Sequence, residues 1–189
     1  MKQSLLALAV LTFFSCDTHI HPSTPPSYFM TADVNMMAWA ADKGFGTATL
    51  DYDFDAHDHF LTLWSQTENP LPNGVRYQVG IDVHSHLSKK RYNFNNNESV
   101  MNEIGGASGI VYGWKKNGED DYFCGYSING FIEITDLTKD NIDGFFEFNA
   151  VTAMSSFDPG NDTIDVQNGK FHVPIGMIIG KDWNGPENP

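Results

Sequence analysis

The sequence predicts an all-β fold, in the form of an antiparallel β-sandwich of about ten short strands. Apolar and polar residues alternate with a period of two in many short stretches, as they do along strands with one buried face. Asn-Gly, a dipeptide that accepts the positive φ angles of tight hairpin turns, recurs at residues 73, 117, 129 and 168. No stretch keeps a helical period for twelve residues. A lipocalin-like closed barrel predicts the same pattern and stays open as the alternative.

The expected strands follow one another closely. Residues 28–34 alternate well, and Gly74 to His86 places valines and isoleucine on one side and polar residues on the other. Two hairpins are expected, one at residues 113–123 around Asn117-Gly118 and one at residues 164–173 around Asn168-Gly169. Further strands are expected at about 45–55, 59–67, 91–95, 108–115, 120–128, 130–135, 143–150, 162–167 and 170–174.

The first fifteen residues have the pattern of a secretory signal peptide. Lys2 precedes a ten-residue apolar run at residues 5–14, and Ser15 supplies the small residue before the cut. The run is half of the roughly 20 residues that a membrane-spanning helix needs, so a cleaved signal is expected.

Cys16 changes the expectation from free secretion to lipidation. Phe13-Phe14-Ser15-Cys16 resembles the lipobox of bacterial lipoproteins, in which the cysteine thiol carries a diacylglycerol and becomes the new N-terminus. An ordinary signal peptide with an incidental cysteine is the alternative. Residues 16–27 contain three prolines and many small polar residues, which predicts an extended tether. We therefore expect a cell-envelope protein that is anchored through Cys16 in the outer membrane, with its face of the membrane undetermined. One β domain, residues 28–189, would follow the tether and end in a loose tail.

Charge excludes one class of partner. Without residues 1–15 the chain has 174 residues, with ten basic and 24 acidic side chains and a net charge of −14. Such a surface repels phosphate backbones, so no nucleic acid partner is expected, and the membrane is contacted through the lipid anchor. Cys124, in an aromatic strand-like setting, is expected to be a buried, inert thiol.

The order of several short motifs resembles a family of small Bacteroidota lipoproteins that share a domain of unknown function. The motifs are the lipobox, Phe29 to Asn35 leading to Trp39-Ala40, Gly130 to Thr135, Gly144 to Ala150, and Ile164 to Phe171. The resemblance spans residues 28–174 and departs from the family pattern at Met36, where the family usually has glycine. It implies a fold and a location, and no catalytic residues.

Six of the seven histidines form His-x-His pairs, at residues 19/21, 57/59 and 84/86. Residues two apart on a strand share a face, so a pair can present two imidazoles to one metal ion. The hypothetical site for zinc or another divalent ion consists of His57, His59, His84, His86 and Asp82, in a metal-binding protein or metal-dependent hydrolase. Alternatively, these side chains continue the solvated faces of their strands.

The acidic run from Asp51 to His59 does not match an EF-hand, because Ala56 and Thr62 stand where glycine and glutamate are required. A solvated edge strand is expected there, with a looser calcium site as the alternative. The sequence has no Gly-x-Ser-x-Gly elbow, no phosphate-binding glycine loop, no His-Glu-x-x-His and no Cys-x-x-Cys. An enzyme is therefore the less favoured interpretation, and no cofactor is expected apart from a divalent metal.

Aromatic residues offer the other candidate site. Exposed rings near polar side chains would bind sugar rings by stacking and hydrogen bonding, and the candidates are Trp64, Tyr112 and Trp114. In the alternative these rings fill the core. The sequence favours an anchored, non-enzymatic binding module that recognises a glycan, a peptide or a partner protein.

Overall fold

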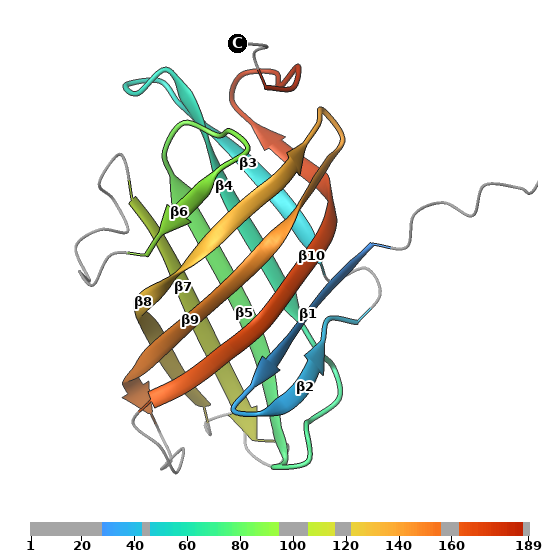
Figure 1. Cartoon of the computed structure of the whole chain (residues 1–189), viewed down its shortest axis with the longest axis vertical. Coiled ribbons are helices and arrows are strands. Elements are labelled where there is room, and N and C mark those ends of the chain that lie inside the picture. Colours follow the sequence, from blue (N-terminus) through green and yellow to red (C-terminus); the bar gives the residue numbers. More distant parts are fainter. Residues whose placement is uncertain (1–27, 43–45, 95–105, 116–121, 156–162, 187–189) are drawn as a thin grey trace, which may run out of the picture.

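The structure is a computed structural model that describes residues 28–42, 46–94, 106–115, 122–155 and 163–186 (Figure 1). The signal peptide, Cys16 and the tether lie outside the described residues. Within the described ranges there is no helix of the length and apolarity that crossing a bilayer demands.

Ten strands make up the regular structure of the described residues, which confirms the all-β prediction. They are β1 (Phe29–Val34), β2 (Met37–Ala40), β3 (Thr47–Asp53), β4 (Asp58–Gln66), β5 (Val75–His84), β6 (Arg91–Asn93), β7 (Gly106–Lys115), β8 (Tyr122–Leu137), β9 (Asn141–Ser155) and β10 (Thr163–Ile179).

The strands form one sheet that is bent into two facing layers. Figure 1 shows β1, β2, β9 and β10 in front, with β3, β4, β5 and β7 behind them. The pairing order is β2-β1-β10-β3-β4-β5-β7-β8-β6, and β9 pairs with both β8 and β10. All pairs are antiparallel except that of β10 with β3. β10 pairs with β9 on one side and with β3 on the other. The series of paired strands β3-β4-β5-β7-β8-β9-β10 therefore closes on β3.

The core lies between the layers and consists mainly of aliphatic side chains, and several of its phenylalanine rings pack against glycines. Phe123 covers Gly113, and Phe171 covers Gly144. A Cβ atom at Gly113 would lie 2.2 Å from the Phe123 ring, so only glycine leaves room for the ring at that position. The fully buried aromatic residues of this core are Trp39, Phe123, Phe146, Phe148 and Phe171.

The predicted hairpin around Asn168-Gly169 is wrong, because β10 runs straight through these residues. The register of β10 against β9 shifts between Val166 and Gly169, so the dipeptide forms a β-bulge. Asn168 has a φ of 55°, the conformation that also suits a tight turn. Similarly, Asn129-Gly130 lies within the continuous strand β8, where two strands were predicted. The register of β8 against β9 shifts directly before the dipeptide, between Ser127 and Asn129, and Gly130 has a φ of 124°. The other predicted hairpin pairs as expected, with Trp114 of β7 opposite Tyr122 of β8, although Asn117-Gly118 itself lies outside the described residues.

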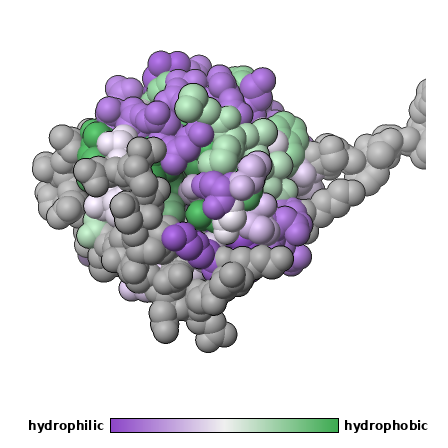
Figure 2. Space-filling model, turned by 90° about the horizontal axis from the view of Figure 1, so that it is seen from below, coloured by the Kyte–Doolittle hydropathy of each residue, from purple (hydrophilic) through white to green (hydrophobic). Residues whose placement is uncertain are grey.

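Two further features complete the domain. A two-residue turn at Asn35 and Met36 joins β1 to β2, with Val34 opposite Met37. After β10, Trp183 packs against the core and its indole N–H donates to the Thr138 carbonyl oxygen at 3.2 Å. This part of the predicted loose tail is therefore held against the domain. Figure 2, which views the lower end of the molecule, shows hydrophilic residues interspersed with small apolar patches.

Candidate ligand-binding face

Trp64, Tyr112 and Trp114 lie on the outer side of the back layer. Trp64 of β4 stands opposite Gly80 of β5, and Gly80 stands opposite Ile110 of β7. Tyr112 and Trp114 follow Ile110 in steps of two, so their side chains leave the same side of the sheet. We call this outer surface, formed by Trp64, Gly80, Ile110, Tyr112 and Trp114, the aromatic face.

Gly80 is what allows Trp64 to lie over β5. A Cβ atom at Gly80 would come within 2.3 Å of the six-membered ring of Trp64 and 2.7 Å of the Ile110 side chain. The ring therefore occupies the space that a side chain at residue 80 would fill. Trp64 nevertheless remains 38% exposed, so a large part of its surface is available to a ligand.

The three rings are in contact with one another. The ring centroids of Trp64 and Tyr112 are 5.7 Å apart, with an angle of 61° between the planes. Tyr112 and Trp114 are nearly parallel, at 18° and 5.9 Å. Both geometries are favourable for aromatic pairs, so the contacts hold the rings in place before any ligand arrives. The three rings therefore form one fixed aromatic cluster, with Trp64 on β4, Tyr112 and Trp114 on β7, and β5 between these two strands.

A carboxylate adjoins this cluster. Asp82 follows Gly80 by two residues on β5 and therefore faces the same way, and Thr62 stands opposite it on β4. The Thr62 hydroxyl donates to one Asp82 oxygen at 2.7 Å. Burial raises the pKa of Asp82, while the bond from Thr62 and the proximity of His84 lower it. The second Asp82 oxygen accepts no hydrogen bond from a described residue, so an acceptor is free beside Trp64.

Tyr112 is supported from β8 by Cys124. The thiol of Cys124 is fully buried, and Cys124 stands opposite Tyr112 on β8; burial raises the pKa of the thiol, while the Tyr126 and Tyr112 hydroxyls lower it. Burial, with a smaller contribution from Cys124, raises the pKa of Tyr112 to about 12, so the phenol stays neutral and keeps its proton for hydrogen bonding. Cys124 is a free, buried cysteine, as the sequence predicted.

The histidines of the hypothetical metal site are placed apart. His59 points into the domain and is only 6% exposed; its Nε2 donates to the Lys181 carbonyl oxygen at 2.8 Å. His84 lies on the outer side, where it packs on Phe60. Since Phe60 and His59 are neighbours on β4, their side chains leave opposite faces of the sheet.

The other two histidines are near the β3–β4 connection. His86 pairs with Asp58 at 2.8 Å, and His57 is in the turn itself with a φ of 56°. Across the part of the chain that the structure describes, no three His, Cys, Asp or Glu side chains gather as metal ligands would. The metal hypothesis therefore gains no support from the described residues.

The acidic run at residues 51–58 forms the end of this hairpin. One Asp53 oxygen accepts the backbone N–H groups of Asp55 and Ala56, at 2.7 and 2.9 Å. Asp53 therefore shapes the turn, as aspartate side chains commonly do.

Three residues in or beside the aromatic face were not assigned to it from the sequence. Asp82 was assigned to the metal site, and Gly80 and Thr62 were not singled out. The sequence does give a reason to single out Gly80. It is the one glycine among the outward-facing residues of β5, and a glycine within a strand often marks the close approach of another group. Thr62 and Asp82 become neighbours only through the register of β4 with β5, which the sequence does not reveal.

Comparison of the chain with protein-family models, with curated proteins and with solved structures gives no match.

Proposed function

We propose that this protein is a lipid-anchored, non-enzymatic binding module of the cell envelope, and that it recognises a glycan on its aromatic face. The observation that carries the proposal is the cluster of Trp64, Tyr112 and Trp114 on one outer surface, next to the free oxygen of Asp82.

This combination suits the two kinds of surface on a sugar. The C–H groups on the face of a pyranose ring are apolar and pack well on an aromatic ring, while its hydroxyls need hydrogen-bond partners around the edge. Trp64 and Tyr112 supply ring surfaces at an angle to each other, and Asp82 supplies the acceptor. Since the rings are already held by mutual contacts, little side-chain entropy is lost on binding.

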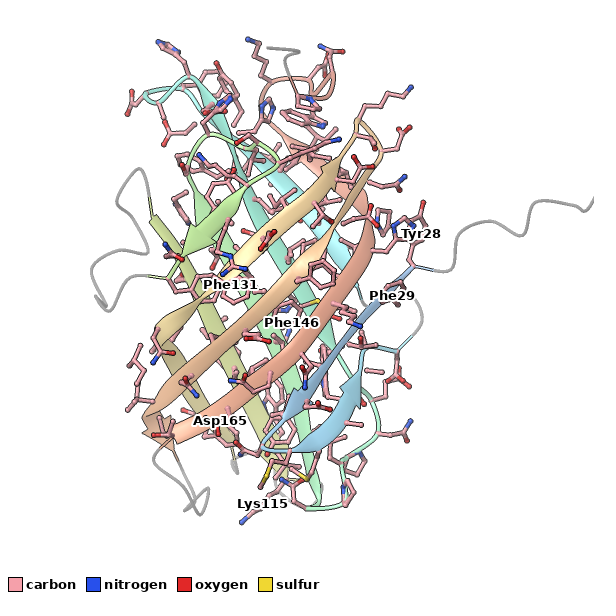
Figure 3. All side chains as sticks on the ribbon, in the orientation of Figure 1. Tyr28, Phe29, Lys115, Phe131, Phe146 and Asp165 are labelled. Atoms are coloured by element: carbon pink, nitrogen blue, oxygen red, sulfur yellow. The ribbon has the colours of Figure 1, made fainter. Side chains whose placement is uncertain are left out.

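The position of Tyr28, where the described domain begins, supports the same function. Tyr28, the first described residue, lies at the edge of the front layer beside β1 (Figure 3), whereas the aromatic face belongs to the back layer (Figure 1). A chain anchored through Cys16 would thus leave the aromatic face unobstructed by its own attachment.

The test is binding of the full chain, purified in detergent, to a panel of neutral and acidic polysaccharides. We expect one or more glycans to bind, and we expect Trp64→Ala to weaken that binding at least about tenfold, since an aromatic residue at the centre of a binding surface commonly contributes about 2 kcal/mol or more. Tyr112→Ala should weaken binding to a similar extent.

The matched control is Phe145→Ala. Phe145 is an exposed aromatic residue on β9, in the opposite layer, so its removal should leave binding unchanged. Absence of binding to every glycan, or equal losses in Trp64→Ala and Phe145→Ala, would contradict the proposal. Binding of a protein partner that Trp64→Ala abolishes would instead assign the face to protein recognition, since tryptophan and tyrosine are also enriched in protein interfaces.

A further inference from the structure

The charges on the aromatic face differ along β5. The outward-facing residues of this strand are, in order, Arg76, Gln78, Gly80, Asp82 and His84. Trp114 stands opposite Arg76, whereas Trp64 stands opposite Gly80. The cation is therefore at the Trp114 end of the face, and the carboxylate is at the Trp64 end.

Arg76 does not neutralise Asp82. Six residues of extended strand separate them by about 20 Å, which is more than twice the distance over which charges are screened at physiological salt. The outward-facing residues of β4 and β7 beside Asp82 are uncharged: Thr62 and Trp64 on β4, and Ser108 and Ile110 on β7. His84 is the nearest titratable neighbour, and it packs on Phe60.

We propose that Asp82 makes the aromatic face selective for uncharged glycans over glycans that carry carboxylates. This inference rests on the proposed function and names the class of ligand for the same surface. The free Asp82 oxygen accepts a hydrogen bond from a sugar hydroxyl that lies beside Trp64. A carboxylate on the sugar at that point would meet a like charge in a partly desolvated site, where the repulsion is stronger than in water.

The variant Asp82→Asn separates this effect from the acidity of the whole protein. The amide oxygen of the substituted side chain can still accept from the Thr62 hydroxyl, so the internal bond is preserved. Asparagine has the same size and shape as aspartate, so removal of the charge should not disturb the packing around residue 82. Glu147→Gln is the matched control: it makes the same change in net charge on β9, on the opposite layer.

The probes are oligosaccharides of β-1,4-linked glucose, mannose and galactose, each with a derivative in which C6 is oxidised to a carboxylate. Binding to the full chain in detergent is measured by calorimetry at low salt. We expect a neutral chain to bind at least tenfold more tightly than its oxidised derivative. In Asp82→Asn this ratio should fall below threefold, and in Glu147→Gln it should stay as in the wild type.

The outcomes separate this inference from the proposed function. If neither neutral nor oxidised chains bind, the glycan-binding function itself is contradicted. If neutral chains bind but the ratio is near one, or stays above tenfold in Asp82→Asn, the function stands and the role of Asp82 is overturned. A preference of the wild type for the oxidised chains would overturn it as well.

Discussion

At the scale of single residues, the clearest backbone strain is at Met36. Asn35 and Met36 form the two-residue turn between β1 and β2, and both have positive φ, at 49° and 62°. A residue with a side chain loses about 1–2 kcal/mol in this conformation, and glycine does not. Met36 is 95% exposed, so its side chain contributes little packing. We therefore expect Met36→Gly to raise the free energy of unfolding by about 1 kcal/mol, with a rise in Tm of about 2–4 °C.

The control for this prediction is the neighbouring methionine. Met37 is in β2, is not among the residues with positive φ, and packs against the core. Met37→Gly should therefore lower the free energy of unfolding by about 1 kcal/mol or more. Urea denaturation of both variants gives the comparison. A destabilised Met36→Gly protein would show that the turn does not require a left-handed backbone at residue 36.

The three aromatic residues that the sequence singled out lie together on one outer face, whereas the histidines of the two central pairs do not. Period-two alternation says that both members of a His-x-His pair share a face, but the phase of the strand decides which face. His59 is in phase with Leu61 and Leu63, which are fully buried, so it points inward. His84 is out of phase with Val79, Ile81 and Val83 and points outward. His59 and His84 therefore lie on opposite faces of the sheet, although each His-x-His pair alone fits the pattern.

At the scale of elements, the sequence predicted the positions of the strands better than it predicted where each strand ends. Alternation is a local signal, and β1, β4, β5 and β7 lie close to their predicted ranges. Asn-Gly is a local signal too, but it has two meanings: a hairpin turn and a β-bulge both need a positive φ. At residues 168–169 the bulge is adopted because β10 pairs with β9 on both sides of the dipeptide. That pairing joins distant residues and cannot be read from the dipeptide.

The bulge in β10 gives a prediction for this element. A Cβ atom at Gly169 would lie 2.4 Å from the Phe146 carbonyl oxygen and 2.6 Å from the Phe146 ring. Backbone and a core ring must both move to relieve this contact, so we expect Gly169→Ala to lower the free energy of unfolding by about 2–3 kcal/mol. Gly176→Ala, on the same strand, is the control. Its nearest contact would be the Thr47 side chain at 3.3 Å, and the expected change is below about 1 kcal/mol. Thermal unfolding that ranks the two variants equally would contradict the packing of the bulge.

At the scale of the whole molecule, the proposal combines an anchor and a binding face on opposite layers. β1 begins at Phe29, in the front layer, while Trp64, Tyr112 and Trp114 project from the back layer. The net charge of −14 that follows from removal of residues 1–15 would keep the domain away from anionic lipid headgroups. Attachment would then depend on the acyl chains at Cys16, and the domain itself would stay free to bind its ligand.

Lipidation of Cys16 is the prediction on which that arrangement depends. In a bacterial host that is fed a radiolabelled fatty acid, the wild-type chain should incorporate label, and its N-terminal peptide should begin at an acylated Cys16. Cys16→Ser should incorporate none, because serine lacks the thiol that accepts the diacylglycerol.

Cys124→Ser is the control: Cys124 is fully buried in the described structure, so it offers no competing acceptor, and its loss should leave labelling unchanged. The mass of the modified peptide gives the number of acyl chains on Cys16. A single acyl chain holds a protein at the membrane only marginally, whereas several together anchor it stably, so this number decides whether the lipid alone suffices as an anchor. Label that persists in Cys16→Ser would place the attachment elsewhere and would remove the reason for treating residues 17–27 as a tether.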